Sequence, residues 1–333
     1  MEKHANISFF VPHLGCSHRC SFCNQNSITG KENLPDKEEI DAAVKIAVKS
    51  KKYSSESTEI AFFGGSFTAI DREYMVYLLS CAYPYVKDGT VKGIRVSTRP
   101  DAIDDEVLGI LKKYGVTAIE LGAQSTDDNV LMLNNRGHDK AAVYEASKKI
   151  KEHGFSLGLQ MMTGLYGANN ESDKKTVLDF IDIKPDTVRI YPTIVLKKTA
   201  LNKLYNEGKY LPPSIDESIK NCSEYYEEFY KNGIKVIRLG LHNINESDYV
   251  AGPWHPAFSQ LCISDIYYKR VIVCLTENGV GNYVLYVNPT EISTFVGQKR
   301  NNILKFRDNG FIVRTVGDEG VKNGDFRIER EVK

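Results

Sequence analysis

Three cysteines lie close together near the start of the chain, at Cys16, Cys20 and Cys23. They directly follow a predicted strand, so their thiols can converge on one centre at the end of that strand. Thiolates are the usual ligands of iron–sulfur clusters. A cluster with four irons and three cysteine ligands leaves one iron open to bind another molecule, as catalytic metals do. The spacing CxxxCxxC therefore predicts a reactive 4Fe–4S cluster.

Other uses of these three cysteines stay open. A structural zinc ion could bind them together with His13 or His18. Zinc sites usually combine one CxxC pair with a second pair of ligands, however, and the sequence has no second pair. The cysteines could also have a redox or a packing role.

The composition is that of a packed soluble protein. Of the 333 residues, 42% are hydrophobic and 26% are charged, and 43 basic residues balance 43 acidic ones. Because proteins whose whole surface binds nucleic acid are usually basic, this balance weighs mildly against that class. The N-terminus has no signal-peptide pattern, and no apolar run reaches the ~18 residues of a membrane span. We therefore expect a cytoplasmic protein with no membrane partner.

The seven cysteines are expected to be thiols or ligands, because the cytosol keeps disulfides rare. An odd number agrees with this expectation. Those outside the CxxxCxxC motif lie in helical or apolar stretches, where free cysteine usually packs in the interior. They are Cys81, Cys222, Cys262 and Cys274.

Short β-rich runs alternate with amphipathic helical patterns over residues 1–242. The strand candidates are 7–11, 59–63, 93–98, 118–122, 156–161, 187–191 and 235–239. The helical patterns occupy 37–51, 72–81, 104–114, 140–153, 172–181 and 215–231. Asp71 can cap the second helix, and Gly115 and Gly154 follow the third and fourth. This alternation predicts an α/β fold of parallel strands with right-handed crossovers, a partial (βα)6-type TIM barrel.

The pattern changes at a turn-rich joint around Gly252, Pro253 and Pro256. The residues beyond it predict a helix at 257–276, a strand at 283–287, a helix at 291–307 and a strand pair at 311–316 and 326–332. We therefore expect two domains, the barrel over residues 1–242 and a small α/β extension over 243–333. The helices of the extension carry apolar faces that must be buried, so it should be folded and could cover the active site.

The cysteine motif, with the aromatic Phe22 before its last cysteine, resembles the signature of the radical S-adenosylmethionine (SAM) superfamily. Further segments over residues 5–240 resemble the radical SAM domain of the Elongator catalytic subunit and, more distantly, oxygen-independent coproporphyrinogen oxidases. These segments are FFGGSF at 62–67, STRPD at 97–101, ELGAQS at 120–125, NRGH at 135–138 and YPT at 191–193.

The resemblance implies a chemistry. The open iron would chelate the methionine end of SAM, and an electron from the cluster would cleave SAM into methionine and a 5′-deoxyadenosyl radical. This radical would abstract hydrogen from a substrate, while the protein orients the cofactor and excludes side reactions. An electron donor such as flavodoxin or ferredoxin is implied as a partner.

The nearest resemblance implies that the substrate is a tRNA or nucleotide base. A small metabolite or a peptide stays open as the substrate, and so does a non-enzymatic metal-binding or electron-transfer role. An acetyltransferase domain completes the Elongator subunit, but this sequence runs only to residue 333 and its first strand begins near Ile7. We therefore expect neither that domain nor the N-terminal tRNA-binding extension, and no acetyl-CoA-dependent modification of tRNA uridine.

The resemblance also assigns the contacts of SAM. Gly64 and Gly65 have no Cβ at the end of a strand, so their backbone can approach the SAM amino group. Gln124 and Arg136 match residues that contact SAM, and an arginine fork suits its carboxylate. Phe22 is expected beside the same cofactor.

Four further positions complete the expected SAM site. Ser66 stands where many members of the superfamily have glutamate, although the Elongator branch also has a small hydroxyl residue there. Ser97 and Gln160 match positions on the ribose side of SAM, and Arg99 follows Ser97 at the end of the same strand. Tyr191 could line the substrate cavity.

Overall fold

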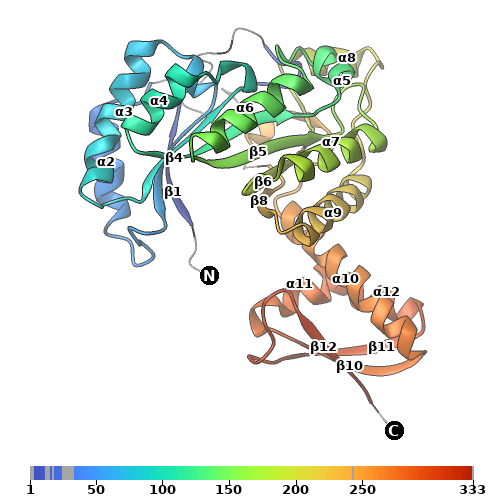
Figure 1. The fold of residues 1–333 in the computed structure, drawn as a ribbon. Helices are drawn as coiled ribbons and strands as arrows, with labels where there is room; N and C mark the ends of the chain where they lie inside the picture. Colours follow the sequence, from blue (N-terminus) through green and yellow to red (C-terminus); the bar gives the residue numbers. More distant parts are fainter. Residues whose placement is uncertain (1–3, 12–15, 17–18, 25–33, 242–243, 332–333) are drawn as a thin grey trace. The chain divides into compact units, whose positions relative to one another are not determined.

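The computed structural model describes residues 4–11, 16, 19–24, 34–241 and 244–331. The chain groups into two compact units. The first comprises Met1–Pro213 and Phe229–Pro253, and the second comprises Ser214–Glu228 and Trp254–Lys333. Each unit has a sheet of its own (Figure 1).

A seven-stranded parallel sheet forms the centre of the first unit, with the order β1-β2-β3-β4-β5-β6-β8. Its strands are β1 (Ala5–Phe10), β2 (Thr58–Phe63), β3 (Gly93–Thr98), β4 (Val116–Gln124), β5 (Ser156–Thr163), β6 (Thr187–Pro192) and β8 (Lys235–Leu239). The sheet is curled, and β1 and β8 lie at its two edges. The prediction of a partial TIM barrel is confirmed.

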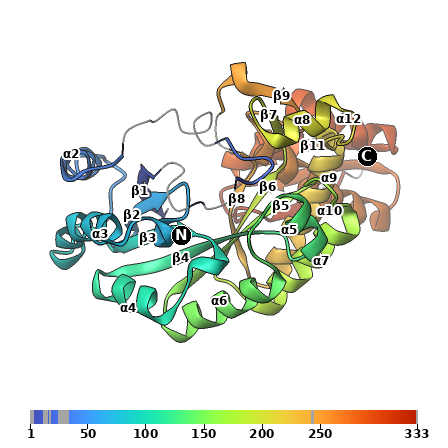
Figure 2. The same ribbon diagram turned by 90° about the horizontal axis from the view of Figure 1, so that it is seen from above.

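Helices connect the strands of the first unit and lie around the outer face of its sheet (Figure 2). They are α2 (Lys37–Ala47), α3 (Arg72–Lys87), α4 (Asp105–Lys113), α6 (Lys140–Glu152) and α7 (Asn170–Ile183). The short helices α5 (Asp128–Leu133) and α8 (Ala200–Asn206) lie in the segments that follow β4 and β7 (Val195–Leu196), and α9 (Ile215–Lys231) belongs in part to each unit. The predicted helix ends are confirmed: Asp71 accepts a hydrogen bond from the Tyr74 amide, and Gly115 and Gly154 have φ of +74° and +78°.

Side chains alternate between the two faces of each strand. On β3, Ile94 and Val96 are completely buried in the apolar core, whereas Arg95 and Ser97 point to the opposite face. A short antiparallel pair, β7 (Val195–Leu196) with β9 (Tyr249–Ala251), lies beyond the end of β6. The curled sheet therefore has a polar inner face and an apolar outer face, and the packing of the outer face fixes the positions of the strands.

The second unit has a mixed three-stranded sheet with the order β11-β10-β12, in which β10 is parallel to β11 and antiparallel to β12. Its elements are α10 (Phe258–Asn278), β10 (Gly281–Val287), α11 (Ile292–Val296), α12 (Asn301–Asp308), β11 (Phe311–Gly317) and β12 (Phe326–Arg330). The helices lie on one face of this sheet (Figure 1). Aromatic side chains such as Tyr267, Phe295 and Phe306 fill the core between them.

Two predictions for this unit were wrong. The helix predicted over 291–307 is two helices, α11 and α12, because Gly297, Lys299 and Arg300 have positive φ values of 79°, 52° and 61°. The two last strands were predicted to pair with each other, but each pairs with β10, on opposite sides. Apolar spacing continues through the turn at Gly297, so periodicity alone could not reveal it.

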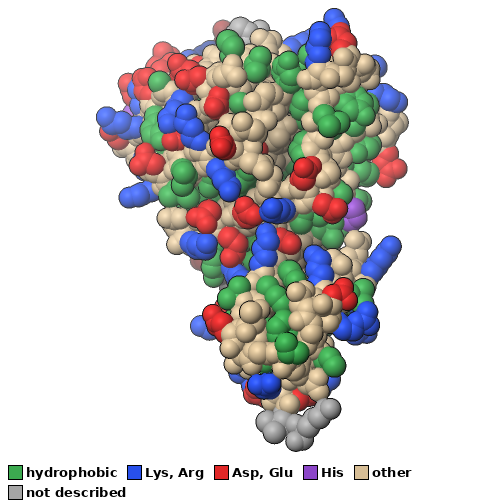
Figure 3. Space-filling view, turned by 90° about the vertical axis from the view of Figure 1, so that its right-hand side faces the viewer, with side chains coloured by type: hydrophobic (Ala, Val, Ile, Leu, Met, Phe, Trp, Pro, Cys, Tyr) green, Lys and Arg blue, Asp and Glu red, His purple; other side chains and the backbone are tan. Residues whose placement is uncertain are grey.

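The helices in the described part of the chain are all too short or too polar to cross a membrane. Positive and negative side chains are interspersed over the face that Figure 3 shows. This agrees with the equal totals of basic and acidic residues. Any contact with a polyanion must therefore depend on a local group of basic residues.

Candidate functional site

A cavity of about 510 Å³ lies in the first unit, at the carboxyl ends of the strands and along the inner face of the sheet. Nearly all residues predicted to bind the cluster or SAM line it. They are Cys16, Cys20, Phe22, Cys23, Gly64, Gly65, Ser97, Arg99, Gln124, Arg136 and Gln160. The topology of the sheet brings these residues together, because the carboxyl ends of parallel strands share one edge.

Ser66 is the exception. It is completely buried, its Oγ lies 2.8 Å from Thr98 Oγ1, and it accepts a hydrogen bond from the Arg99 amide. Ser66 therefore joins the loop after β2 to the end of β3 and does not line the cavity. Arg99 does line it, but its guanidinium is paired with Asp101 at 3.0 Å.

The three cysteine side chains are half-buried. Arg136 donates a hydrogen bond to Cys20 Sγ at 3.0 Å, and the Cys23 amide donates to the Cys20 carbonyl at 3.2 Å. Burial, and then the neighbouring Cys20 thiol, raises the pKa of the Cys16 thiol. Among the described residues, no three His, Cys, Asp or Glu side chains stand close enough together to hold a metal ion. The thiols share one cavity without converging at ligand distance.

The donor set in this cavity fits an iron–sulfur cluster. It consists of three cysteine sulfurs that line one cavity, and Arg136 donates a hydrogen bond to one of them, Cys20 Sγ. The alternative zinc ligands, His13 and His18, lie outside the described residues.

Gln124 and Arg136 pack together over Gly122. A Cβ on Gly122 would lie 3.1 Å from Gln124 Nε2 and 3.7 Å from an Arg136 terminal nitrogen, and Arg136 also donates to the Gly122 carbonyl. Gln124 has a left-handed backbone with φ of 68°, at an irregularity in the pairing of β4 with β5. Such strain in a non-glycine residue persists where the surrounding structure imposes it, commonly at functional sites.

Two buried polar atoms of this pair are unsatisfied. Within the described residues, Gln124 Oε1 and Arg136 Nε have no hydrogen-bond partner. Unpaired buried polar atoms are costly in a folded protein and call for an explanation. Gln124 Oε1 is an acceptor and Arg136 Nε is a cationic donor. Together they fit the ammonium and carboxylate groups at the methionine end of SAM.

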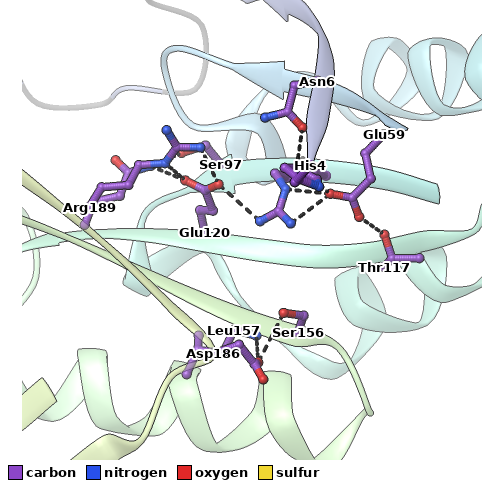
Figure 4. Close-up of polar contacts among 12 residues, drawn as sticks. His4, Asn6, Glu59, Ser97, Thr117, Glu120, Ser156, Leu157, Asp186 and Arg189 are labelled. Atoms are coloured by element: carbon purple, nitrogen blue, oxygen red, sulfur yellow. Dashed lines mark hydrogen bonds and ion pairs between the residues drawn. The ribbon is translucent and has the colours of Figure 1, made fainter. Parts of the chain in front are cut away.

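Buried charges cross the inner face of the sheet next to the cavity (Figure 4). Glu120 is 1% exposed and accepts hydrogen bonds from Arg189 at 2.6 and 2.8 Å and from Arg95 at 3.2 Å. Arg95 also bonds to Glu59 at 2.8 Å, and Thr117 donates to Glu59 at 2.6 Å. Four strands are thereby linked by alternating acidic and basic side chains.

This network holds two of the predicted SAM residues. Gln160 Nε2 donates to Glu120 Oε2 at 2.9 Å and to Ser97 Oγ at 3.1 Å. Burial alone would raise the pKa of Glu120, but the hydrogen bonds and charge of Arg189, together with Arg95 and Gln160, outweigh burial and lower it. Glu120 is therefore ionised at neutral pH and fixes the orientation of the Gln160 amide.

Sequence reasoning assigned no role to Glu120 or Arg189, although Arg189 lines the cavity. A signal was present. Strands of a parallel sheet usually have nearly continuous apolar sequences. Four strands of this chain instead carry a charged residue in their interior, namely Glu59, Arg95, Glu120 and Arg189. Charges at such positions in several neighbouring strands indicate an ion-pair network across the sheet.

His138 is a further residue of the cavity that the sequence analysis left without a role. Burial, and then the charge of Arg136, lowers its pKa to about 4, so the ring is neutral at physiological pH. Its Nε2 lies 3.1 Å from the Ala123 carbonyl and must carry the proton to donate there. Nδ1 is then an acceptor, and it has no partner in the described part of the chain.

A large part of the cavity lining is apolar. It consists of Phe10, Phe63, Met162, Tyr191, Pro192, Ile194, Leu196, Leu241 and Ile244. The Arg189 guanidinium stands 5.4 Å from the centre of the Phe63 ring. Aromatic side chains beside a cation can stack against a flat conjugated ring.

Asp173 fixes the loop that follows β5, and it should make stability depend on pH. Its carboxylate accepts a hydrogen bond from the Gly164 amide at 3.0 Å, and burial raises its pKa to about 7. Between about pH 4 and 7 the folded chain therefore holds a proton that the unfolded chain has lost, so stability falls as the pH rises. Asp173→Asn should raise the free energy of unfolding at pH 8 by at least about 1 kcal/mol.

Denaturant unfolding between pH 5 and 8 measures this effect. Asp308→Asn, at an exposed position in α12, is the matched control and should leave the pH profile unchanged. If Asp173→Asn gives the same profile as the unmodified chain, the carboxylate is ionised over this range and the expectation is wrong.

Comparisons with known proteins agree with this geometry. Residues 10–181, just over half of the chain, match the Radical SAM superfamily, and residues 185–267 match the radical SAM C-terminal domain. The chain is 26% identical over 207 residues to the tRNA uridine(34) acetyltransferase of Methanocaldococcus infernus, covering 56% of this chain and 39% of that protein. It is 30% identical over 183 residues to human Elongator complex protein 3, covering 49% and 34%. The chain thus spans about two fifths or less of these relatives.

An uncharacterised protein of Methanocaldococcus jannaschii is matched over more of its length, with 27% identity over 274 residues that cover 77% of this chain and 82% of that protein. Among solved structures, the Elp3 of Methanocaldococcus infernus superimposes with a TM-score of 0.68 at 22% identity, covering 81% and 64% of the two chains. Coproporphyrinogen III oxidase of Escherichia coli gives a TM-score of 0.50 at 17% identity, covering 70% and 54%. These two likenesses establish the fold.

Proposed function

Since this chain belongs to the radical SAM superfamily, whose cofactors are a 4Fe–4S cluster and SAM, we propose that Cys16, Cys20 and Cys23 hold the cluster. We propose further that the enzyme modifies a base of tRNA or of another nucleotide. One observation carries the proposal: three thiols, a pair of unsatisfied polar groups and an apolar wall with aromatic side chains line a single cavity. Bound there, the two cofactors would supply a 5′-deoxyadenosyl radical that abstracts hydrogen from the substrate.

The residues around the cavity would orient SAM. Gly64 and Gly65 have φ of 81° and 52° and leave the backbone open to the SAM amino group. Arg136 would bind the carboxylate as a charge-assisted donor, and Gln124 would complete the contacts of the methionine end. Gln160, which Glu120 and Ser97 hold in place, would bind the ribose side.

A nucleotide base as the substrate is supported by two observations. The relatives named above are tRNA uridine(34) acetyltransferase and Elongator complex protein 3, although this chain matches only part of each. The cavity lining includes Phe10, Phe63 and Tyr191, against which a base can stack. Enzymes that modify a base of a nucleic acid take it out of its stack into such a cavity. Acetyl transfer is not proposed for this chain.

A small metabolite is the second candidate. The zero net charge favours it, because a protein that binds polyanions over its whole surface is usually basic. The cavity of about 510 Å³ is also within the range of small-molecule sites. The experiment below separates the two candidates.

The proposed function is tested on the protein after anaerobic reconstitution with iron and sulfide. The reconstituted protein is incubated with SAM, dithionite and fractions of an extract from cells grown in deuterated medium. Deuterium in 5′-deoxyadenosine marks the fraction that holds the substrate. Activity that is lost on ribonuclease treatment supports a tRNA base, and activity in a protein-free and RNA-free fraction supports a small metabolite. A reconstituted cluster that never yields 5′-deoxyadenosine with any reductant would contradict the radical mechanism.

Arg136→Ala should weaken the binding of SAM by roughly one to two decades, because losing a charge-assisted contact costs about 1.5–3 kcal/mol. The iron content should stay unchanged, since arginine is not a ligand. Equilibrium dialysis with labelled SAM measures the affinity. Arg72→Ala is the control, because its side chain is exposed and its nearest acidic partner, Glu106, is 4.0 Å away. Equal affinities of the two variants would show that Arg136 does not bind SAM.

We propose that a one-electron donor of the flavodoxin or ferredoxin class reduces the cluster, since enzymes of this superfamily generally need a reductant. We also propose that the protein acts in the cytoplasm, where cysteines stay reduced and available as ligands. Reduction of the reconstituted cluster by purified flavodoxin and its reductase, followed by SAM cleavage, would test the first of these proposals.

A further inference from the structure

The second unit contains a β-α-α-β segment formed by β10, α11, α12 and β11. A short loop, Gly297-Gln298-Lys299-Arg300, connects the two helices. This segment lies beyond residue 267, where the family matches end. Its possible role is therefore separate from the residues that carry the radical chemistry.

The base of this loop is fixed by the core of the unit. Gly297 is buried with φ of 79°, and a Cβ there would lie 3.1 Å from Ser264 Oγ and 3.2 Å from the Asn302 backbone nitrogen. Asn302 is 2% exposed, and its amide donates to the carbonyls of Ser264 and Phe295, both at 2.9 Å. The loop therefore has one defined conformation that only glycine permits at its first position.

Two cations stand on the exposed side of the loop. Lys299 and Arg300 are exposed, and both have left-handed backbones, with φ of 52° and 61°. Throughout the described part of the chain, neither side chain has a hydrogen bond or an ion pair. The loop thus presents two positive charges that no internal carboxylate neutralises.

The surface continues along α12. Leu304 and Arg307 lie four and seven residues after Arg300, so all three share one face of the helix. Leu304 is 41% exposed and Arg307 is exposed, whereas Asn302 and Phe306 on the other face are buried. A cation, an apolar side chain and a second cation therefore follow one another on a surface that the core holds rigid.

We propose that this surface, formed by Lys299, Arg300, Leu304 and Arg307, binds single-stranded RNA. The cations would contact successive phosphates, and Leu304 would support an unstacked base. KH modules use a glycine-initiated four-residue loop in this way to clamp about four nucleotides of a single strand. Arg300 stands at the end of the loop, where the GXXG pattern has its second glycine, and has the left-handed backbone that glycine favours.

A single strand is the occupant that these features favour. Basic and acidic residues balance over the whole chain, so a polyanion has to bind locally, and the loop supplies cations without partners. Duplex RNA is recognised by shape across two successive grooves, which needs a far longer surface than one loop and an eight-residue helix. The proposal goes beyond the proposed function, because it concerns residues outside the cavity and does not depend on which molecule the radical attacks.

The test uses the full chain and a fluorescein-labelled single-stranded RNA of about 12 mixed nucleotides, with fluorescence anisotropy at two salt concentrations. The double variant Lys299→Glu/Arg300→Glu should bind at least about tenfold more weakly, with a smaller dependence on salt. Lys299→Arg/Arg300→Lys keeps both charges and should bind like the unmodified chain. Lys45→Glu/Lys49→Glu, at exposed positions in α2 and in the turn that follows it, changes the net charge equally and should retain the affinity.

SAM cleavage and iron content should be the same in all of these variants, which separates this test from that of the proposed function. Equal weakening by the two glutamate pairs would overturn the proposal, because it would show only an effect of net charge. Stronger binding of an RNA duplex, or equal binding of single-stranded DNA of the same sequence, would overturn the assignment to single-stranded RNA. Unchanged affinity of Lys299→Glu/Arg300→Glu would exclude this surface.

Discussion

Replacing Cys16, Cys20 and Cys23 together by alanine is expected to abolish the binding of iron and sulfide, and with it all cleavage of SAM. After anaerobic reconstitution the unmodified chain should hold ~4 iron and ~4 sulfide, as one 4Fe–4S cluster does. The variant has lost every proposed ligand, so no residual cluster should form. Iron and sulfide analysis, and chromatographic detection of 5′-deoxyadenosine, measure the two losses.

Cys81→Ala is the control for this prediction. Cys81 is 5% exposed within α3, far along the chain from the motif, and its change should leave both iron content and SAM cleavage intact. The variant should lose some stability only, because a small buried side chain is shortened. Stoichiometric zinc without iron in the anaerobically prepared chain would support the zinc alternative and contradict the cluster.

Glu120→Ala is expected to cause the largest loss of stability among single changes outside the apolar core. Glu120 is buried and compensates Arg189 and part of the charge of Arg95. Removing one partner of a buried ion pair typically costs about 3–5 kcal/mol, because the other charge stays buried without compensation. Chemical denaturation at pH 7 should show a fall of this size in the free energy of unfolding.

The same carboxylate predicts a pH dependence. Its pKa is lower in the folded chain than in the unfolded one, so its stabilisation is fully present at neutral pH. That stabilisation is lost as the pH falls below about 4.3 and through the lower folded pKa. Glu106→Ala is the matched control, because Glu106 is exposed and a surface ion pair contributes only about 0–1 kcal/mol. Similar losses for both variants would show that the network does not stabilise the fold.

Many of the helices and strands could be predicted from the order of residue types. The strands Gly93–Thr98 and Lys235–Leu239 and the helix Ile215–Lys231 have the predicted bounds. Apolar runs, caps and the glycines after helices are local signals that do not depend on the rest of the fold. The position of the cysteines after the first strand followed from the same signals, because a parallel sheet collects its strand ends at one edge.

The remaining features depend on contacts between distant parts of the chain. The pairing of Glu120 with Arg189 needs the register of β4, β5 and β6, which a single strand cannot specify. Ser66 looked like a ligand because of its motif, yet its hydroxyl bonds to Thr98 of the next strand. The break of the last helix depends on left-handed residues at 299 and 300, which are not glycine. That the C-terminal extension covers the active site stays a prediction.

The order of the strands in the large sheet has a consequence for how the protein is made. Because sheet order follows chain order, each strand emerging from the ribosome can join the free edge left by the one before, and none has to insert between earlier strands. The inner charges alternate in sign in the same order, from Glu59 to Arg95, Glu120 and Arg189. A newly added strand shifted by one residue would turn its charge to the apolar face and leave the previous charge unpaired. During synthesis, Arg95, Glu120 and Arg189 would thus each favour the register that pairs them with the charge already in place.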